Sequence, residues 1–512
     1  MLLLGLMSAA LLVLVSVFLG EVTSALAARE PERFSQALIQ FLGVILLGLP
    51  FLSLKTYIQA KLSLYWRKWL TDRALKQYLE NQRFYQLNAN LLIDNPDQRI
   101  AEDIKTLTQQ SLFFIVIAFD AVLQLAAFTG VLWSISKPLM VFLILYAIVG
   151  TTVTTAVFGR SLVGINAEQL KREADFRFSL VRVRENAEAI ASYQGQALES
   201  EQVWQRFLAV FHNFNHLIRW QLGLNFFQNG YQYLTFLLPA LILAPAILSG
   251  QQEIGVEAQA STAFRIILLA LALVIKQFEQ LTALIASVDR LDCLETSTIP
   301  IPLNAPVIQM IEGDRIILDH LTLHTPDYQT VLIQDLSFRL PPGESLLIMG
   351  KSGVGKSSLL RAIAGLWQAG SGSITRPPLE KILFLPQRPY LPLGSLRHQL
   401  AYPHSPLNFT DEQLLQALEQ GNLPDLSTRF GGLDAIEDWS KLLSVGEQQR
   451  LVFARLFLTQ PTYAILDEAT SGLDIANEKR LYEQLQKTNM TYLSVGHRSM
   501  LRNYHQAVLQ LS

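Results

Sequence analysis

Hydrophobic residues form long, almost uncharged runs in the first part of the chain and only short runs after residue 295. A run of about twenty apolar residues is long enough to cross a hydrocarbon core of about 30 Å as a helix. We therefore predict that residues 1–295 form an α-helical membrane domain. Its six predicted spans are residues 2–19, 37–54, 112–135, 139–158, 231–248 and 263–284.

Positive charge in the connecting segments predicts the orientation of the spans. Segment 55–105 carries nine Lys or Arg residues and segment 160–219 carries eight, whereas segment 136–138 carries one and segment 249–261 carries none. Cytoplasmic loops hold the excess of Lys and Arg in membrane proteins. The two charged segments are therefore predicted to be cytoplasmic, and both termini lie on the same side.

The first span has an alternative interpretation. Residues 1–28 are apolar and end in Ala25-Leu26-Ala27, a sequence typical of a signal-peptide cleavage site. The charged start of such a peptide is absent, because no basic residue precedes Arg29. We predict a retained span, and cleavage would leave five spans without inverting the others.

Asp120 and Arg265 are ionisable residues that fall within the predicted spans. Asp120 lies in the middle of the third span, where an ionised carboxylate costs roughly 2.5–3.5 kcal/mol unless it faces a polar cavity or a partner. A functional site and a helix-packing role both fit this aspartate. Arg265 is expected to lie close enough to the external end of its span to extend its guanidinium to the interface.

The second part of the chain carries a phosphate-binding loop of the form G-x-x-x-x-G-K-[ST]. Residues 350–357 match it between an apolar, strand-like run at 345–349 and a helical pattern that begins at Ser358. In such a loop backbone N–H groups surround the β-phosphate, the lysine reaches the β- and γ-phosphates, and the last hydroxyl binds Mg²⁺. The residues predicted to bind nucleotide here are Gly350, Ser352, Gly353, Gly355, Lys356, Ser357 and Ser358.

A second motif narrows the class of nucleotide-binding protein. Leu443-Ser444-Val445-Gly446-Glu447 precedes a helical pattern, and an apolar strand ends soon after in Asp467-Glu468. Residues 307–512 therefore resemble the nucleotide-binding domain of ATP-binding cassette (ABC) proteins, with an α/β fold and an LSGGQ-type signature. Val445 and Glu447 depart from the consensus. The resemblance implies that Ser444 and Gly446 contact the γ-phosphate of ATP held by another subunit.

Three further residues match the family in order along the chain. Gln387 resembles the Q-loop glutamine that senses Mg²⁺, Asp474 the D-loop aspartate at the nucleotide site, and His497 the switch histidine. Considered singly, Asp474 is equally typical of a turn and His497 of an ordinary surface histidine. The resemblance makes Gln387, Glu468 and His497 the predicted catalytic residues.

The residue types indicate the chemistry of this site. Mg²⁺ prefers oxygen ligands and keeps much of its hydration, so Ser357, Gln387 and Asp467 are the predicted metal ligands, with Asp467 acting through water. Glu468 is then free to orient or deprotonate the attacking water, while Lys356, Mg²⁺ and His497 stabilise the transferring phosphoryl group. No aromatic residue that would stack on adenine occurs at 323–326, where Tyr328 is the nearest substitute.

The membrane half carries a resemblance of its own. It is similar to SbmA/BacA-type peptide transporters and to peroxisomal fatty-acyl transporters of ABC subfamily D, and closest to the bacterial vitamin B12, bleomycin and antimicrobial-peptide branch. This implies an exporter-type fold whose cytoplasmic loops dock on the ATPase domain. The segments that carry the resemblance are Trp66-Arg67-Lys68-Trp69-Leu70, Asn95-Pro96-Asp97-Gln98-Arg99-Ile100, Glu173-Ala174-Asp175-Phe176-Arg177 and Glu188-Ala189-Ile190-Ala191-Ser192-Tyr193.

Composition sets the remaining limits. Half of the residues are hydrophobic and 16% are charged, which excludes a soluble cassette ATPase of DNA repair or translation. The 41 basic and 43 acidic residues form no net basic surface for nucleic acid. The single cysteine, Cys293, excludes an intrachain disulfide. A proline-rich segment at 296–306 is the predicted linker between the domains at 1–295 and 307–512.

These observations predict an ATP-driven half-transporter in a bacterial inner membrane, with its ATPase domain in the cytoplasm. It is expected to bind ATP and Mg²⁺, to form a homodimer with shared ATP sites, and to move a corrinoid, a peptide or an acyl or lipid-like solute. The alternative is a membrane-anchored ATP-gated channel or regulatory ABC protein, for which the complete hydrolytic set of residues would not be needed.

Overall fold

The computed structural model describes the whole chain except residues 90–95, 272, 274–276, 297–305 and 512. The chain divides into two compact units, Met1–Thr298 and Ile299–Ser512. Two predictions fall largely or partly outside the described residues, namely the linker at 296–306 and the central part of the sixth span, and so does Asn95 of the segment 95–100 that carries the resemblance.

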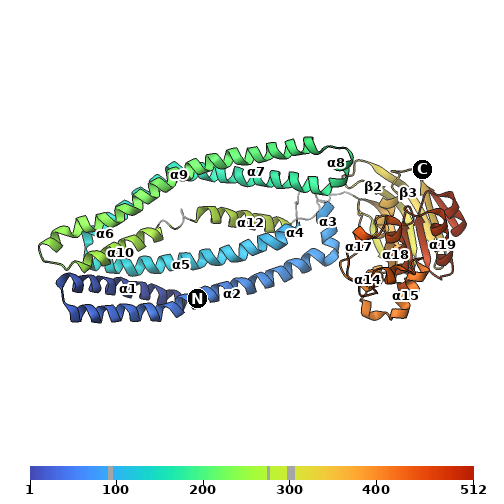
Figure 1. The fold of residues 1–512 in the computed structure, drawn as a ribbon. Helices are drawn as coiled ribbons and strands as arrows, with labels where there is room; N and C mark the ends of the chain where they lie inside the picture. The colour runs from blue at the N-terminus through green and yellow to red at the C-terminus, as the bar shows by residue number, and fades with distance from the viewer. Residues whose placement is uncertain (90–95, 272, 274–276, 297–305, 512) are drawn as a thin grey trace. The chain divides into compact units, whose positions relative to one another are not determined.

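The first unit is built from long helices that run beside one another (Figure 1). In the part of the chain that the structure describes, five helical segments are long and apolar enough to cross a membrane, and each contains one of the first five predicted spans. The long apolar helices are α1 (Leu2–Ala28), α2 (Pro31–Leu79), α5 (Ile104–Ile135), α6 (Lys137–Val153) and α9 (Gln196–Leu248). The sixth span begins in α10 (Gly255–Leu271), and α12 (Phe278–Thr296) contains its last residues.

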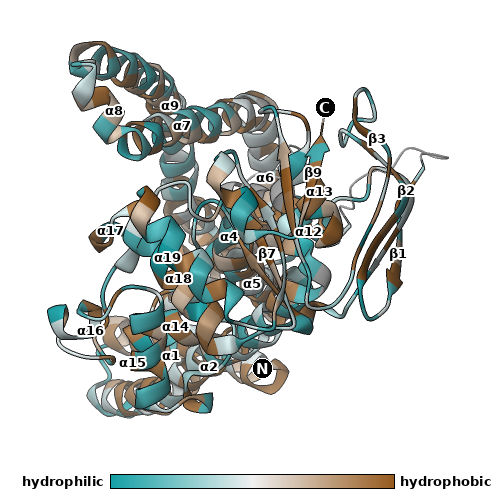
Figure 2. Cartoon of the chain, turned by 90° about the vertical axis from the view of Figure 1, so that its right-hand side faces the viewer, coloured by the Kyte–Doolittle hydropathy of each residue, from teal (hydrophilic) through white to brown (hydrophobic). Residues whose placement is uncertain are grey.

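Shorter elements connect these helices. The charged segment 160–219 is mostly helical, and α7 packs along α9, with the short α8 between them. Figure 2 shows mainly hydrophilic residues where α7, α8 and the adjoining part of α9 lie. The connecting elements are η1 (Glu80–Gln82), α3 (Arg83–Ala89), α4 (Pro96–Gln98), η2 (Arg99–Asp103), η3 (Thr154–Gly159), α7 (Arg160–Glu185) and α8 (Ala187–Ser192).

Small residues allow α1 and α10 to approach closely. A side chain at Gly255 would place its Cβ 1.9 Å from the carbonyl oxygen of Gly20, so no larger residue fits there. The backbone N–H of Gly255 donates a hydrogen bond of 3.0 Å to Ser24 Oγ. Close backbone contact through small residues, together with hydrogen bonds between helices, is the usual source of helix association in membranes.

Asp120 forms an ion pair, which the sequence alone did not predict. Lys55 Nζ of α2 lies 2.5 Å from Asp120 Oδ2 of α5, and the two side chains are 12% and 20% exposed. Lys55 Nζ also donates to Ser8 Oγ of α1 at 3.4 Å. The Lys55 ammonium thus joins α2 to α1 and α5, an arrangement that supports the helix-packing interpretation of Asp120.

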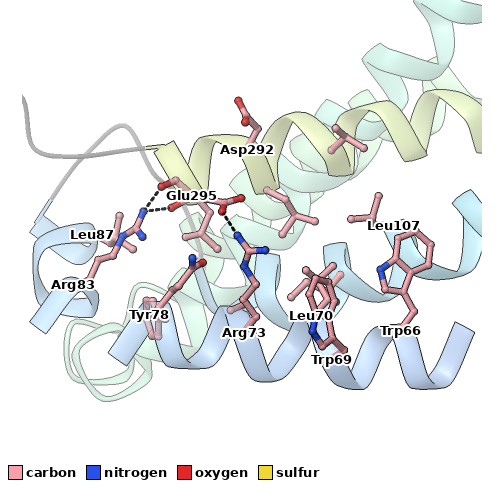
Figure 3. A pocket seen from close by; sticks show the side chains of 16 residues that line it. Trp66, Trp69, Leu70, Arg73, Tyr78, Arg83, Leu87, Leu107, Asp292 and Glu295 are labelled. Carbon is pink, nitrogen blue, oxygen red and sulfur yellow. Dashed lines mark hydrogen bonds and ion pairs between the residues drawn. The ribbon is translucent and has the colours of Figure 1, made fainter. Parts of the chain in front are cut away.

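The C-terminal end of α12 is held by two arginines (Figure 3). Arg73 of α2 forms an ion pair of 2.9 Å with Glu295, and Arg83 of α3 donates hydrogen bonds to the carbonyl oxygens of Leu294 and Glu295. A cavity of about 390 Å³ lies beside this contact, with Trp66 and Trp69 among its lining residues. The last helix of the first unit is therefore fastened to α2 and α3 immediately before residues 297–305.

The second unit contains two sheets. The four-stranded sheet has the order β1-β5-β2-β3, and the five-stranded sheet is parallel, with the order β6-β7-β8-β4-β9. The strands are β1 (Gln309–Glu312), β2 (Ile316–His324), β3 (Val331–Leu340), β4 (Ser345–Gly350), β5 (Gly370–Arg376), β6 (Ile382–Leu385), β7 (Tyr463–Asp467), β8 (Thr491–Val495) and β9 (Ala507–Leu511).

Helices cover the parallel sheet and separate its strands along the chain, which is typical of an α/β fold. They are α13 (Lys356–Ile363), η4 (Leu379–Lys381), α14 (Leu396–Ala401), η5 (Pro406–Asn408), α15 (Asp411–Gln420), α16 (Leu426–Arg429), α17 (Trp439–Leu442), α18 (Val445–Thr459), α19 (Ile475–Gln486) and η6 (Ser499–Tyr504).

Burial on both faces explains why the central strands are almost entirely apolar. All five residues of β8 are buried, as are four of the five in β7. Strands of a parallel sheet covered on both faces have this continuous hydrophobic pattern. Since parallel strands end at one edge, the residues that follow β4, β6, β7 and β8 gather there, and ligands bind at that edge in open α/β sheets.

The Lys55–Asp120 pair yields a stability prediction. Asp120→Leu should lower the free energy of unfolding by roughly 3–5 kcal/mol, because it leaves the ammonium of Lys55 buried without a partner. The double variant Lys55→Met/Asp120→Leu should recover most of this loss. Thermal unfolding in lipid nanodiscs measures both effects. The exposed pair Asp72–Lys76 provides the control, and Lys76→Met should leave the melting temperature unchanged.

If Asp120→Leu unfolds at the wild-type temperature but abolishes transport, the packing role is wrong and the aspartate serves the solute instead.

Candidate nucleotide-hydrolysing site

The phosphate loop connects β4 to α13 as the sequence predicts. Gly353 and Gly355 have φ values of 85° and 98°, which residues with a side chain rarely adopt, so the motif needs glycine at both positions. Lys356 is buried, and its Nζ donates hydrogen bonds of 2.9 Å to the carbonyl oxygens of Gly350 and Lys351. The ammonium group is thus held within the loop by the loop's own backbone.

Two further residues predicted to bind nucleotide, Ser352 and Ser358, lie before α13 and within its first turn. Ser352 lies in the turn before α13 and is exposed, and Ser358 lies in the first turn of α13, whose N-terminal N–H groups point toward the loop. A phosphate in this loop would meet the unpaired N–H groups and the positive end of the helix dipole. The geometry therefore fits the nucleotide phosphates.

Two oxygen-bearing side chains meet at the carboxyl end of β7. Ser357 Oγ donates a hydrogen bond of 3.0 Å to Asp467 Oδ1. Burial raises the pKa of Asp467, and the hydrogen bond from Ser357 lowers it in part. A divalent cation at this position would compensate the buried negative charge, and both residues offer the hard oxygen ligands that Mg²⁺ prefers.

The described residues contain no group of three or more His, Cys, Asp or Glu side chains that could hold a metal ion. Mg²⁺ in phosphoryl-transfer sites is commonly bound by one or two protein oxygens together with substrate phosphates and water. Ser357 and Asp467 fit this kind of site, in which bound nucleotide completes the coordination.

The three predicted catalytic residues come together at Glu468. Gln387 Nε2 donates a hydrogen bond of 3.0 Å to Glu468 Oε2, and His497 Nε2 lies 3.0 Å from Glu468 Oε1. These residues follow β6, β7 and β8 respectively, so the parallel order of the strands brings them together. Each oxygen of the carboxylate thus has its own nitrogen partner.

The backbone at Glu468 also holds the carboxylate in place. Its φ is 49°, an unusual value for a residue with a side chain, and its N–H donates a hydrogen bond of 3.1 Å to the carbonyl oxygen of Val495. Residues in this conformation cluster at active sites. The Glu468 side chain is 22% exposed, so water can reach it. The arrangement can position a water molecule and accept its proton.

The signature residues begin α18. Ser444 is the N-cap of this helix, and it forms a capping box with Glu447, whose Oε2 accepts a hydrogen bond of 2.9 Å from the Ser444 N–H. Glu447 Oε1 lies 2.7 Å from Arg429 Nη2. The glutamate that departs from the consensus therefore caps the helix, and Arg429 compensates its charge.

The predicted trans contacts of the signature are not formed within one chain. None of the described hydrogen bonds joins Ser444 or Gly446 to the phosphate loop. Asp474, predicted at the nucleotide, is the N-cap of α19 and accepts a hydrogen bond of 2.8 Å from the Asn477 N–H. Tyr328 lies in the turn between β2 and β3, where its hydroxyl donates to the carbonyl oxygen of Pro306 at 3.1 Å.

Gln449 is a residue whose role sequence reasoning missed. Its buried amide accepts a hydrogen bond of 2.9 Å from the Gly472 N–H, and its Nε2 donates to the Gln387 carbonyl oxygen and to Ser471 Oγ, both at 3.3 Å. Gln449 thus joins the signature helix to the segment at Gln387 and to the segment that follows Glu468. The one feature of the sequence that indicates this role is an amide side chain on the apolar face of the helix that follows the signature.

Both parts of the chain are similar to known protein families. The family model "ABC transporter transmembrane region 2" matches residues 1–248, and the model "ABC transporter" matches residues 333–471. An uncharacterized ABC transporter ATP-binding protein of Synechocystis sp. is 47% identical over 96% of this chain and 76% of its own.

Two further relatives are more distant. The human lysosomal cobalamin transporter ABCD4 is 32% identical over 92% of this chain and 84% of its own. The solved structure of a bacterial Atm1-family ABC exporter with ATP bound matches with a TM-score of 0.82, covering 100% of this chain and 92% of that one, at 17% identity. At 17% identity, this structural match shows a shared fold.

The position of Glu468 leads to a first prediction for the chemistry. Glu468→Gln should lower ATP turnover by about a hundredfold or more, because the amide cannot accept a proton from water. ATP affinity should be retained. Lys356→Ala should instead weaken ATP binding, since it removes the cation held in the phosphate loop. Equilibrium binding of radiolabelled ATP and steady-state hydrolysis separate the two effects, and near-normal turnover of Glu468→Gln would overturn the assignment.

The contacts of Gln449 yield a prediction about positioning. Gln449→Leu leaves the Gly472 N–H and the Gln387 carbonyl without their partners, and each buried unpaired group costs about 1–3 kcal/mol. We expect kcat to fall about tenfold with the KM for ATP little changed. The control is Gln448→Leu, whose amide donates to the carbonyl oxygens of Ser440 in α17 and of Leu443. Equal kcat values for the two variants would refute the positioning role.

Proposed function

Since the chain belongs to the ABC transporter family, as a half-molecule with one membrane domain and one ATPase domain, we propose that two copies form a homodimer with two shared ATP sites. The chain is an integral membrane protein and an ATPase whose hydrolysis drives a solute across the membrane. The predicted resemblance, exporter-type fold class and ATP-driven transport are thereby confirmed.

The proposal of shared sites is supported by the contrast between the two halves of the site. Gln387, Glu468 and His497 assemble within one chain, whereas none of the described hydrogen bonds joins Ser444 or Gly446 to the phosphate loop. The signature would then serve the nucleotide of the partner subunit. This contrast is the observation on which the proposal chiefly rests.

Exposed apolar side chains support a dimer at the same surface. Val445, in the signature, is 59% exposed, and Ile475, which follows the D-loop aspartate, is 65% exposed. The two segments are neighbours, since a Cβ at Gly472 would lie 2.9 Å from Val445 Cγ1. Exposed apolar residues around a polar site are typical of a surface that a partner covers.

We propose Mg²⁺ as the metal that accompanies ATP. Ser357 and Asp467 would hold it, with Gln387 near the same end of the sheet, and the metal would neutralise charge on the phosphates. Glu468 would orient the attacking water, and His497, at 3.0 Å from that carboxylate, would keep the carboxylate in position. Closure of the dimer around ATP would assemble these groups with Ser444 of the partner subunit.

We propose a bacterial inner membrane as the location, with the ATPase domain in the cytoplasm. The excess of Lys and Arg in segments 55–105 and 160–219 supports the cytoplasmic placement of these segments.

A gated channel or a regulatory protein would not require the complete set formed by Lys356, Gln387, Glu468 and His497.

A corrinoid is the first solute to test, because one relative at 32% identity is named a cobalamin transporter. Peptides and acyl compounds are the alternatives. Uptake of labelled cobalamin, a labelled peptide and a labelled acyl-CoA into inside-out and right-side-out vesicles identifies the solute and the direction. Glu468→Gln vesicles provide the control for ATP-driven movement. If ATP drives none of the three compounds, the proposed substrate classes are wrong.

Shared sites lead to a prediction for mixed dimers. Chains with Lys356→Ala and chains with Ser444→Arg should each be inactive alone. A heterodimer of the two has one site with both lesions and one site with neither, so mixing should restore part of the ATPase activity. Subunit exchange is verified with two affinity tags. If exchange is complete and no activity returns, either the sites lie within single chains or two intact sites are needed.

A further inference from the structure

A cavity of about 210 Å³ lies within the membrane unit between α6, η3, α9 and α10. These elements contact one another, and α6, α10 and the C-terminal part of α9 lie at the same end of the helical unit in Figure 1. One part of the lining is apolar, from residues such as Phe227 and Leu268. The other part is polar, from Thr151, Thr154, Gln228, Asn229, Gln232 and Arg265.

Most polar side chains of this cavity have no hydrogen-bond partner among the described residues. Among the described residues, the side chains of Thr151, Gln228, Asn229 and Gln232 make no hydrogen bond, whereas Thr154 Oγ1 donates to the Gly150 carbonyl oxygen at 2.8 Å. Polar side chains in membrane helices normally find partners on neighbouring helices, because none are available in hydrocarbon. A group of amides without partners therefore indicates a place for a polar ligand.

Arg265 gives the cavity its charge. Its only described side-chain interaction is with the ring of Phe236, 5.5 Å from the guanidinium carbon, and no described carboxylate pairs with it. The residue lies about 15 Å along α10 from its start at Gly255, taking 1.5 Å per residue. The Arg265 side chain lines the cavity at this point of α10, and the expectation that it extends to the membrane interface stays a prediction.

The contrast with Lys55 is informative. The charge of Lys55 is neutralised, because Asp120 lies 2.5 Å away. Arg265 has no such counter-charge among the described residues, and an ionisable group within a membrane domain is by default a functional site. A ligand that carries negative charge would supply what Arg265 lacks.

We propose that this cavity binds an oxyanion, a carboxylate or a phosphate, on the transported solute. Arg265 contacts the oxyanion through its planar guanidinium, which matches either group in a two-pronged hydrogen bond. Gln228, Asn229 and Gln232 donate amide hydrogen bonds to the same group or to polar atoms beside it. The inference rests on the proposed transport function and narrows its substrate to organic anions.

The size and lining of the cavity define the rest of the ligand. Sites that enclose a whole drug-sized ligand measure about 300–1,000 Å³. A cavity of about 210 Å³ holds the anionic group and the atoms next to it, while Phe227 and Leu268 contact an adjoining apolar part. A corrinoid phosphodiester, a peptide carboxylate and an acyl-CoA phosphate all satisfy this description.

Charge-selective labelling tests the proposal without knowledge of the solute. In a Cys293→Ser background, Asn229→Cys places a thiol in the cavity and Ser249→Cys places one outside it. The ratio of labelling rates for an anionic sulfonate and a cationic trimethylammonium methanethiosulfonate should be about tenfold higher at position 229 than at position 249. Arg265→Gln should remove this difference, and Arg265→Lys should keep it.

Competition then distinguishes the two oxyanions. Laurate, dodecyl phosphate and dodecyltrimethylammonium share one alkyl chain and differ in their head group. Laurate or dodecyl phosphate should slow the labelling of Asn229→Cys, and whichever protects better identifies the carboxylate or the phosphate as the preferred group. Dodecyltrimethylammonium should not protect.

Equal labelling ratios at positions 229 and 249 overturn the proposal, as does equal protection by the cation. The Asn229→Cys chain carries the test with Arg265 intact, so the result does not depend on whether a variant of Arg265 folds. Labelling is measured without nucleotide. A failure of the proposed transport function would therefore appear as absent ATP-driven uptake with the labelling preference unchanged, and a failure of this inference would appear in the labelling alone.

Discussion

The two contacts to the Glu468 carboxylate, a hydrogen bond from Gln387 and a close approach of His497 Nε2, are the interaction on which the rest of the ATPase unit depends. A carboxylate that activates water must be fixed in direction, and here each oxygen is held at 3.0 Å by a nitrogen, one from Gln387 and one from His497. This requires three strand ends at one edge of a sheet. The parallel order β6-β7-β8 supplies them, and buried apolar strands keep that order. The buried amide of Gln449 extends the same network to the signature helix.

A second constraint governs the membrane unit, where water is not available to satisfy polar groups. The chain meets it by close packing at Gly20 and Gly255 and by pairing Lys55 with Asp120. Arg265 and its amide neighbours are the exception. The Lys55–Asp120 pair stabilises the packing of helices. Arg265, which has no counter-charge among the described residues, is the residue that we propose binds a ligand.

Much of the fold could be predicted from local sequence. The first five spans, the phosphate loop and the strand that ends in Asp467 depend on the hydrophobic period and on glycine positions, which neighbouring residues determine. Partners distant in sequence could not be predicted. Lys55 lies 65 residues from Asp120, and Arg429 reaches Glu447 across a fold that the pattern does not specify. Gln449 was missed for the same reason, because only the assembled structure shows what its amide joins. For Arg265 the residue was noticed, but its surroundings depend on three helices at once.

The most direct test of the account is a cross-link between the phosphate loop of one subunit and the signature of the other. In a Cys293→Ser background, chains with Ser352→Cys are mixed with chains carrying Ser444→Cys, and a short bifunctional thiol reagent is added with and without ATP. The account predicts a covalent heterodimer that forms in the presence of ATP and is lost when Lys356→Ala prevents nucleotide binding. A cross-link that is absent, or that forms equally well without ATP, would contradict ATP sites shared between two subunits.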